Sequence, residues 1–191
     1  MATPTITEVS ICSSALTKLG DETITSLTDD NDRARKCNLL YGSTRDSVLR
    51  SHPWNFALKR ASLAALVDAP IWEYDYAYQL PADCLRLVKT NANTKDVHKI
   101  EGRQIYTDAV APLLILYVRR VEETTDFDAN FVDALIVRLA FELANVITGK
   151  KRYAEEMWGE YQTKLAHART IDGMEGSPEV LDDHTLTDFR Q

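Results

Sequence analysis

Hydrophobic residues recur at helical spacing in four segments of the chain. In one of them Leu135, Leu139 and Leu143 follow one another every four residues, which places them on the same face of an α-helix. A second face of the same segment is also apolar, so this helix is expected at the centre of a bundle. The pattern as a whole predicts helices at residues 6–19, 30–52, 128–148 and 151–171.

Residues that favour helix ends stand at the borders of these segments. Thr5 and Glu8 have the spacing of a capping box at the start of the first helix. Gly20 and Gly149 can end the first and third helices, because glycine adopts the left-handed conformation that commonly follows a helix. The candidate N-caps of the second and third helices are acidic residues, namely Asp29 or Asp30, and Asp126 or Asp128.

The period changes from helical to extended at Pro53. Proline disfavours a helical conformation at the preceding residue, so the second helix should end near His52. Trp54 and Phe56 then alternate with polar or small residues, which predicts a strand. We interpret Pro53, Trp54 and Phe56 as a structural junction that fastens a helical layer to a sheet.

Short alternating segments follow as far as residue 121. Tyr74, Tyr76 and Tyr78 fall on one face of a predicted strand, and Glu101-Gly102 is a weak hairpin signal. Residues 113–121 are rich in β-formers and predict a central strand covered on both faces. The expected fold is therefore α+β, a bundle of about four helices with a small, mainly antiparallel β-sheet at residues 54–121, inserted between helices two and three.

The remaining residues of the chain differ from the body in charge. The net charge is −7, and residues 172–191 contain six acidic residues against one arginine, which leaves only −2 for the rest. We predict one domain at residues 1–173 and an extended acidic C-terminal arm at residues 174–191. A fully solvated segment has no need of large apolar side chains. The four apolar residues of this arm are therefore candidates for an interface: Val180, Leu181, Leu186 and Phe189.

The charge pattern also limits the partners of the protein. The sequence contains no run rich in lysine or arginine, so it lacks the electrostatic features of a protein that grips nucleic acid. The longest apolar run, residues 113–118, is far shorter than the roughly 20 residues of a membrane-spanning helix. The first ten residues lack the order of a signal peptide, so we expect a soluble protein made in the cytoplasm.

No pattern typical of catalysis stands out. The four histidines are scattered, and Cys12, Cys37 and Cys84 are expected to be buried free thiols. Asp83 is more simply a turn residue than part of a nucleophilic site. The tyrosine row favours a core or interface face over a base-stacking platform. Arg119 and Arg120 are interpreted as solvated ends or as inter-subunit ion pairs, and they join the interface candidates. The sequence thus predicts no catalytic, cofactor-binding or metal site.

Several short matches, in a consistent order, do resemble a known family. They are Ala15-Leu16, Leu19-Gly20, Ile24, Ser26-Leu27, Ala34, Cys37, Tyr41, residues 53–57 (PWNFA), Leu80-Pro81, residues 83–86 (DCLR), Glu101-Gly102 and Tyr117. In this order they resemble the tail tubular protein A family, the head-to-tail adaptors of short-tailed bacteriophages and related prophages. The resemblance covers most of the chain up to the fourth helix.

The resemblance implies a structural virion protein without catalytic residues. Family members are helical bundles with an attached β-region, and they form dodecameric rings between the portal protein and the tail nozzle protein. We therefore expect a ring of copies of this chain in the neck of a virion. The ring would continue the DNA channel while packaged DNA is retained and when it is ejected. We expect no specific DNA binding, no membrane contact and no cofactor. The arm would then order on the portal or on a neighbouring subunit. The alternatives are a connector or tail-completion protein of a long-tailed phage, a nucleic-acid-binding module, and a small enzyme.

Overall fold

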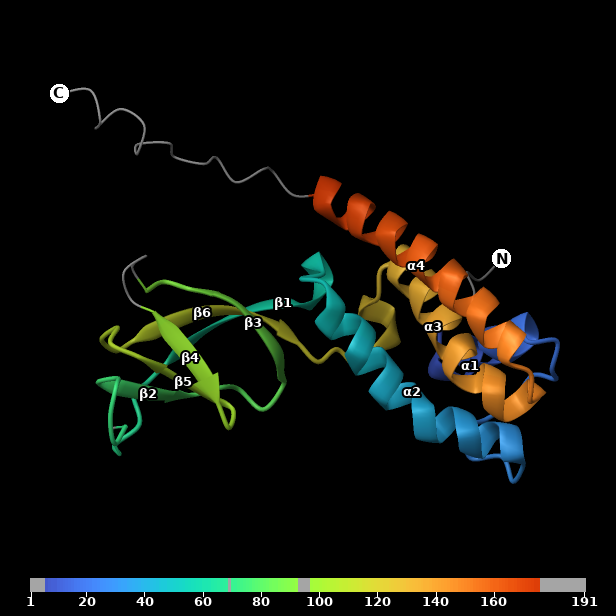
Figure 1. Ribbon diagram of the computed structural model, residues 1–191, viewed down its shortest axis with the longest axis horizontal. Helices are drawn as coiled ribbons and strands as arrows, with labels where there is room; N and C mark the ends of the chain where they lie inside the picture. The colour runs from blue at the N-terminus through green and yellow to red at the C-terminus, as the bar shows by residue number, and fades with distance from the viewer. Residues whose placement is uncertain (1–5, 69, 93–96, 176–191) are drawn as a thin grey trace.

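The computed structural model describes residues 6–68, 70–92 and 97–175, and it divides into two lobes (Figure 1). The first is a helical lobe, formed by α1 (Glu8–Lys18), α2 (Asp32–Ser51), α3 (Ala129–Thr148) and α4 (Lys151–Met174). The second is a β-lobe, inserted between α2 and α3, whose strands are β1 (Leu58–Leu63), β2 (Tyr76–Gln79), β3 (Cys84–Thr90), β4 (His98–Glu101), β5 (Gln104–Thr107) and β6 (Leu113–Arg119). The predicted α+β fold class is confirmed.

The helix ends agree with the sequence prediction in part. Asp128 caps α3 as predicted, because its carboxylate accepts hydrogen bonds from the first backbone amides of the helix. Gly149 follows α3 with a φ of 64° and Gly20 follows α1 with a φ of 73°, so both helices end at a left-handed glycine. At the C-terminal end, α4 continues to Met174, three residues beyond the predicted end.

The other two predicted N-caps need correction. Asn31 caps α2, since its side-chain oxygen accepts the amide of Ala34 at 2.8 Å. Asp29 instead closes the preceding loop by accepting backbone amides from residues 25 and 26. The capping box of α1 is formed by Thr7 and Ser10, two positions after the predicted one, and Thr5 lies outside the described residues.

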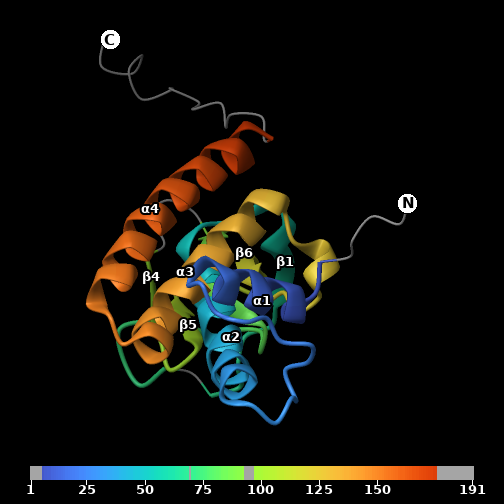
Figure 2. The same ribbon diagram turned by 90° about the vertical axis from the view of Figure 1, so that its right-hand side faces the viewer.

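Helix α3 lies at the centre of the helical lobe, as its all-round apolar character predicted. It contacts α1, α2 and α4, and Figure 2 shows it between the other helices. Its side chains at 131, 135, 139 and 143 are completely buried. Arg138 and Glu142 form an ion pair at 2.6 Å, and the Arg138 guanidinium also lies over the ring of Trp158 on α4.

The β-lobe consists of two three-stranded antiparallel sheets, with strand orders β1–β6–β3 and β2–β5–β4. The predicted hairpin at Glu101-Gly102 is confirmed. It connects β4 and β5 through Gly102 and Arg103, whose φ angles are both positive, as in the turns that match the twist of a hairpin.

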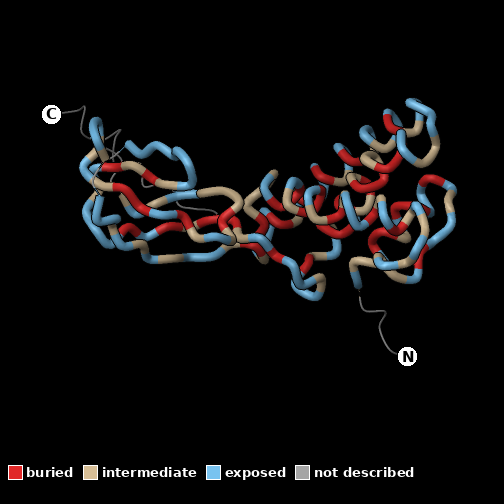
Figure 3. The backbone as a smooth tube through the Cα atoms, turned by 90° about the horizontal axis from the view of Figure 1, so that it is seen from below, coloured by how far each residue is buried: buried red, intermediate tan, exposed pale blue. Residues whose placement is uncertain are grey.

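Buried residues form two separate groups, one in each lobe (Figure 3). The group in the β-lobe lies on the inward face of β6, where Leu113, Ile115 and Tyr117 contact Tyr78 and Ile105 of the other sheet. Strand β6 is central in its sheet, as predicted. The prediction that both of its faces are covered is wrong toward its start, because Leu114 on the opposite face is 48% exposed.

Two predictions about strand position were also wrong. Residues 55–57 form a short 3₁₀-helix, and the first strand begins only at Leu58. The cause is that Trp54 turns back into the helical core, where it is completely buried and its indole nitrogen donates to the Val48 carbonyl at 3.1 Å. The tyrosine strand begins at Tyr76, so that Tyr74 lies in the preceding loop.

Candidate functional site

The junction between the lobes contains the three residues that we interpreted as structural. Trp54 lies edge-on to Phe131 of α3, with ring centroids 5.3 Å apart. Phe56 contacts the same ring at 5.0 Å. Pro53 immediately precedes this cluster, in the non-helical turn that follows α2. These aromatic contacts attach the base of the β-lobe to the centre of the helical lobe.

A hydrogen-bonded network that sequence reasoning missed lies beside this cluster. His52 Nε2 is 3.1 Å from Asp172 Oδ2, and the backbone amide of Asn55 donates to Asp172 Oδ1 at 2.9 Å. Burial lowers the pKa of His52, and the charges of Arg169 and Arg86 add to this effect, while the hydrogen bond to Asp172 opposes it. Because His52 and Asp172 are 120 positions apart, no spacing in the sequence indicates the pair.

The network has a structural character. The groups that surround the Asp172 carboxylate are an imidazole and a backbone amide, and the Asn55 side chain donates to the Asp172 carbonyl at 2.7 Å. Together these donors satisfy the polar groups of a residue that is only 8% exposed. The network therefore fastens the end of α4 to the start of the β-lobe.

Asp83 takes part in a second polar cluster, at the base of β3. Its carboxylate accepts hydrogen bonds from Lys59 at 2.9 Å and from the Tyr117 hydroxyl at 3.0 Å. Burial raises the pKa of Asp83, but these hydrogen bonds outweigh it and leave the pKa below its ordinary value. Asp83 lies in the turn before β3, as predicted, and its carboxylate has Lys59 and Tyr117 as partners.

Arg119 and Arg120 form ion pairs within the chain. Arg119 lies 3.0 Å from Asp126, and Arg120 lies 2.7 Å from Asp46 of α2. The sequence interpretation offered solvated ends or inter-subunit pairs and missed both partners. Asp46 is 74 residues from Arg120, and Asp126 was considered only as a candidate helix cap. Both arginines stay partly exposed, so their role at an interface stays a prediction.

The other predicted interface residues belong to the C-terminal arm. Val180, Leu181, Leu186 and Phe189 lie outside the described residues. All three cysteines are buried and free, as predicted. Tyr78 is buried and its hydroxyl donates to the Ala109 carbonyl at 2.6 Å, so its ring face is part of the core and cannot stack on bases.

An exposed apolar surface of the β-lobe lies at the loop between β1 and β2. Val67 and Ile71 are fully exposed, and Trp72 is 76% exposed. We call these three residues the tip surface. Large apolar side chains that gather in this way on a protein surface commonly mark a site of protein interaction, and sequence reasoning did not identify this one because the loop has no periodicity.

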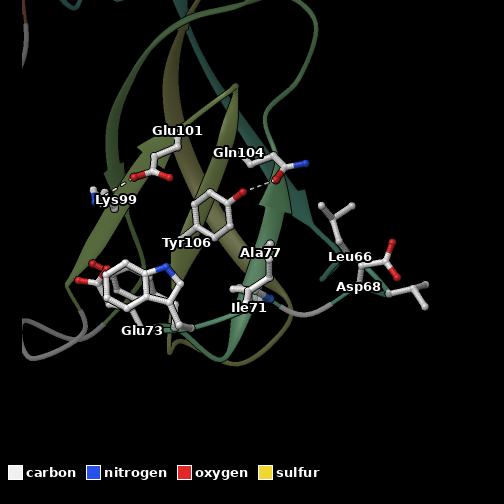
Figure 4. A pocket seen from close by; sticks show the side chains of 13 residues that line it. Leu66, Asp68, Ile71, Glu73, Ala77, Lys99, Glu101, Gln104 and Tyr106 are labelled. Atoms are coloured by element: carbon white, nitrogen blue, oxygen red, sulfur yellow. Dashed lines mark hydrogen bonds and ion pairs between the residues drawn. The ribbon is translucent and has the colours of Figure 1, made fainter.

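A hollow of about 630 Å³ lies between the tip surface and the β2–β5–β4 sheet (Figure 4). Its polar side chains pair with one another, since Lys99 lies 2.9 Å from Glu101 and the Tyr106 hydroxyl donates to Gln104 at 2.7 Å. The charges left at its edge are the acidic residues Asp68 and Glu73. The apolar residues at this hollow can contact another protein surface.

Neither a metal site nor a membrane segment is found in the described part of the chain. Within residues 6–68, 70–92 and 97–175, no three histidine, cysteine or acidic side chains gather as metal ligands would. Among the helices in those same ranges, none combines the length and apolar character that crossing a bilayer requires.

No protein-family model and no curated protein matches this chain.

Proposed function

We propose that this protein is a structural component of a virion, a head-to-tail adaptor that forms a closed ring, with twelve copies as the expected number, between a portal protein and a tail nozzle. The resemblance of the sequence to the tail tubular protein A family suggests this role. The observation that carries it is the tip surface, where Val67, Ile71 and Trp72 are exposed in the isolated chain and require a partner to be covered.

The two-lobed shape also supports a role in assembly. The helical lobe and the β-lobe have separate cores, and the tip surface lies at the far end of the β-lobe from the helices. A subunit of this shape can present different surfaces to its neighbours in a ring and to the parts above and below the ring. The net charge of −7 would let DNA pass through such a ring, because an acidic lumen repels phosphate weakly.

Electron microscopy of the purified protein with its portal protein tests the proposal. We expect a closed ring stacked on the portal ring. The variant Ile71→Ser combined with Trp72→Ser should leave the circular dichroism spectrum of the subunit unchanged and abolish ring formation or the attachment of a neighbouring part. Leu39→Ser is the matched control, because Leu39 on α2 is 78% exposed and distant from the tip surface.

Two results would overturn the proposal. One is a protein that forms no closed ring even when the portal is present. The other is assembly that proceeds normally in the double variant of the tip surface, which would show that these exposed residues serve another purpose.

A further inference from the structure

The outward face of the β1–β6–β3 sheet is only partly covered. The register places three rows of side chains across this face, as follows: Leu58, Val118 and Arg86; then Arg60, Leu116 and Lys89; then Ser62 and Leu114, with Asn91 bonded to Leu114. The first row packs against the helical core, where Val118 is completely buried. The second and third rows continue the apolar stripe outward beyond the helices.

These outer rows form a shallow groove of about 440 Å³. Leu116 and Leu114 lie along its floor, and Arg60 and Lys89 stand on either side of Leu116. The Arg60 side chain makes no hydrogen bond or ion pair with any residue that the structure describes. An apolar floor between two cations is suited to a segment that carries both apolar and acidic side chains.

Positive charge continues from the groove toward the helical lobe. Burial lowers the pKa of Arg86, and the charges of Arg50 on α2 and Arg169 on α4 lower it further. The Arg50 guanidinium donates to the Leu85 carbonyl and that of Arg169 donates to the Ser51 carbonyl at 3.1 Å. Both acceptors are neutral, so these hydrogen bonds do not cancel the positive charges. A negatively charged segment at this place would relieve the repulsion among the arginines.

A segment of this character leaves the described structure close by. Asp172 near the end of α4 is hydrogen-bonded to Asn55, three residues before β1 begins, and Figure 1 shows the end of α4 beside the end of α2 that leads to β1. Ser62 is at most about 25 Å along the chain from Asn55, and the 16 residues after Glu175 can span about 50 Å when extended. Residues 176–191 can therefore reach the whole groove.

The sequence of this segment matches the groove. Residues 176–191 contain four acidic residues and one arginine, together with four large apolar residues, of which Leu181, Leu186 and Phe189 are the bulkiest. The acidic residues complement Arg60, Lys89 and Arg86, and the apolar ones complement Leu114 and Leu116. Attachment to α4 also holds the segment at a high effective concentration next to the groove, which favours binding without a second molecule.

We propose that the outward face of the β1–β6–β3 sheet binds the chain's own C-terminal segment, residues 176–191. Leucine and phenylalanine side chains of the segment lie on Leu114 and Leu116, and its carboxylates face Arg60, Lys89 and Arg86. This inference rests on the sheet face, the end of α4 and the sequence, and it holds whether or not the protein is a phage adaptor. In an adaptor, the groove would hold the arm of each subunit until a partner displaces it.

Hydrogen exchange of the full chain provides the first test. The backbone amides of residues 179–189 should exchange roughly tenfold or more slowly in the unaltered protein than in the variant Arg60→Glu with Leu114→Ser. Arg35→Glu with Leu39→Ser is the matched control, since both positions are exposed on α2 and the control should preserve the slow exchange. Equal exchange of residues 179–189 in all three proteins would overturn the proposal.

Methyl NMR of the full chain provides the second test, from the side of the groove. The variant Leu181→Ser, Leu186→Ser and Phe189→Ser should shift the methyl resonances of Leu114 and Leu116 and leave that of Leu39 unchanged. The shifts should not depend on protein concentration, because the segment and the groove belong to one chain. Unchanged Leu114 and Leu116 resonances would contradict the proposal, and a concentration-dependent change would assign the groove to the segment of another copy and so overturn binding within one chain.

Discussion

Asn55 and Asp172, which are 117 positions apart, form a double connection between the two lobes. The Asn55 backbone amide donates to the Asp172 carboxylate at 2.9 Å, and the Asn55 side-chain amide donates to the Asp172 carbonyl at 2.7 Å. Asn55 begins the 3₁₀-helix that precedes β1, and Asp172 belongs to the last turn of α4. These bonds thus help to fix the position of the β-lobe on the helical lobe.

Replacing Asp172 by alanine should destabilise the protein by about 1–3 kcal/mol, because the half-buried amide of Asn55 then has no acceptor. Chemical denaturation at neutral pH measures this difference. Asp133→Ala is the control, since Asp133 pairs with Lys164 on the surface and such exposed pairs contribute less than about 1 kcal/mol. Equal stability of the Asp172 variant and the control would show that the connection contributes little.

The stability of the protein should depend on the protonation of His52. Burial lowers the pKa of His52 in the folded state, whereas the unfolded chain has a histidine pKa of about 6.5. The unfolded state therefore binds the proton more readily, and the His52 contribution to stability is present above about pH 6.5 and is lost as the pH falls toward the folded-state pKa.

The free energy of unfolding, measured by denaturation at pH values from about 7.5 to about 5, checks this dependence. This range includes the ordinary histidine pKa of about 6.5. His52→Gln should remove the loss of stability in the upper part of that range. His98→Gln, at an exposed position on β4, should retain it. The same pH dependence in the unaltered protein and in His52→Gln would refute the prediction.

Removing the hydroxyl groups of two tyrosines should change the stability of the protein in opposite directions. The Tyr41 hydroxyl is buried and has no hydrogen-bond partner among the described residues, and burial raises its pKa. Tyr41→Phe should therefore raise the free energy of unfolding by about 1 kcal/mol. Tyr78→Phe should lower it by about 1 kcal/mol, because the Tyr78 hydroxyl donates to the Ala109 carbonyl.

Thermal or chemical unfolding of both variants checks this pair of predictions. A loss of stability in Tyr41→Phe would indicate that the hydroxyl has a partner in solution, such as an ordered water molecule.

Binding to double-stranded DNA should be weak. The protein carries a net charge of −7, and the affinity of nonspecific DNA binders comes mainly from phosphate neutralisation. A filter-binding titration at low salt should detect no tight complex. Tight binding that weakens steeply with added salt would instead favour the nucleic-acid-binding alternative.

The helical lobe could be predicted well because its evidence is local. The apolar stripes of α3 and the glycine after it lie in one continuous segment, so periodicity and capping preferences indicate the helix and its ends. The error at residues 54–57 has the opposite origin. Trp54 and Phe56 alternate like strand residues, but contact with Phe131, far along the chain, decides their conformation.

The sequence by itself determined the α+β class, the central position of α3, the hairpin at Gly102 and the acidic character of residues 172–191. These properties depend on side chains that are close together in the chain. Only the tertiary structure decided the division into two sheets, the pairing of His52 and Asn55 with Asp172, the tip surface and the groove beside Leu114. Each of these features depends on contacts between segments that are distant in the sequence. Such contacts are set by the packing of the whole chain, so no local pattern indicates them.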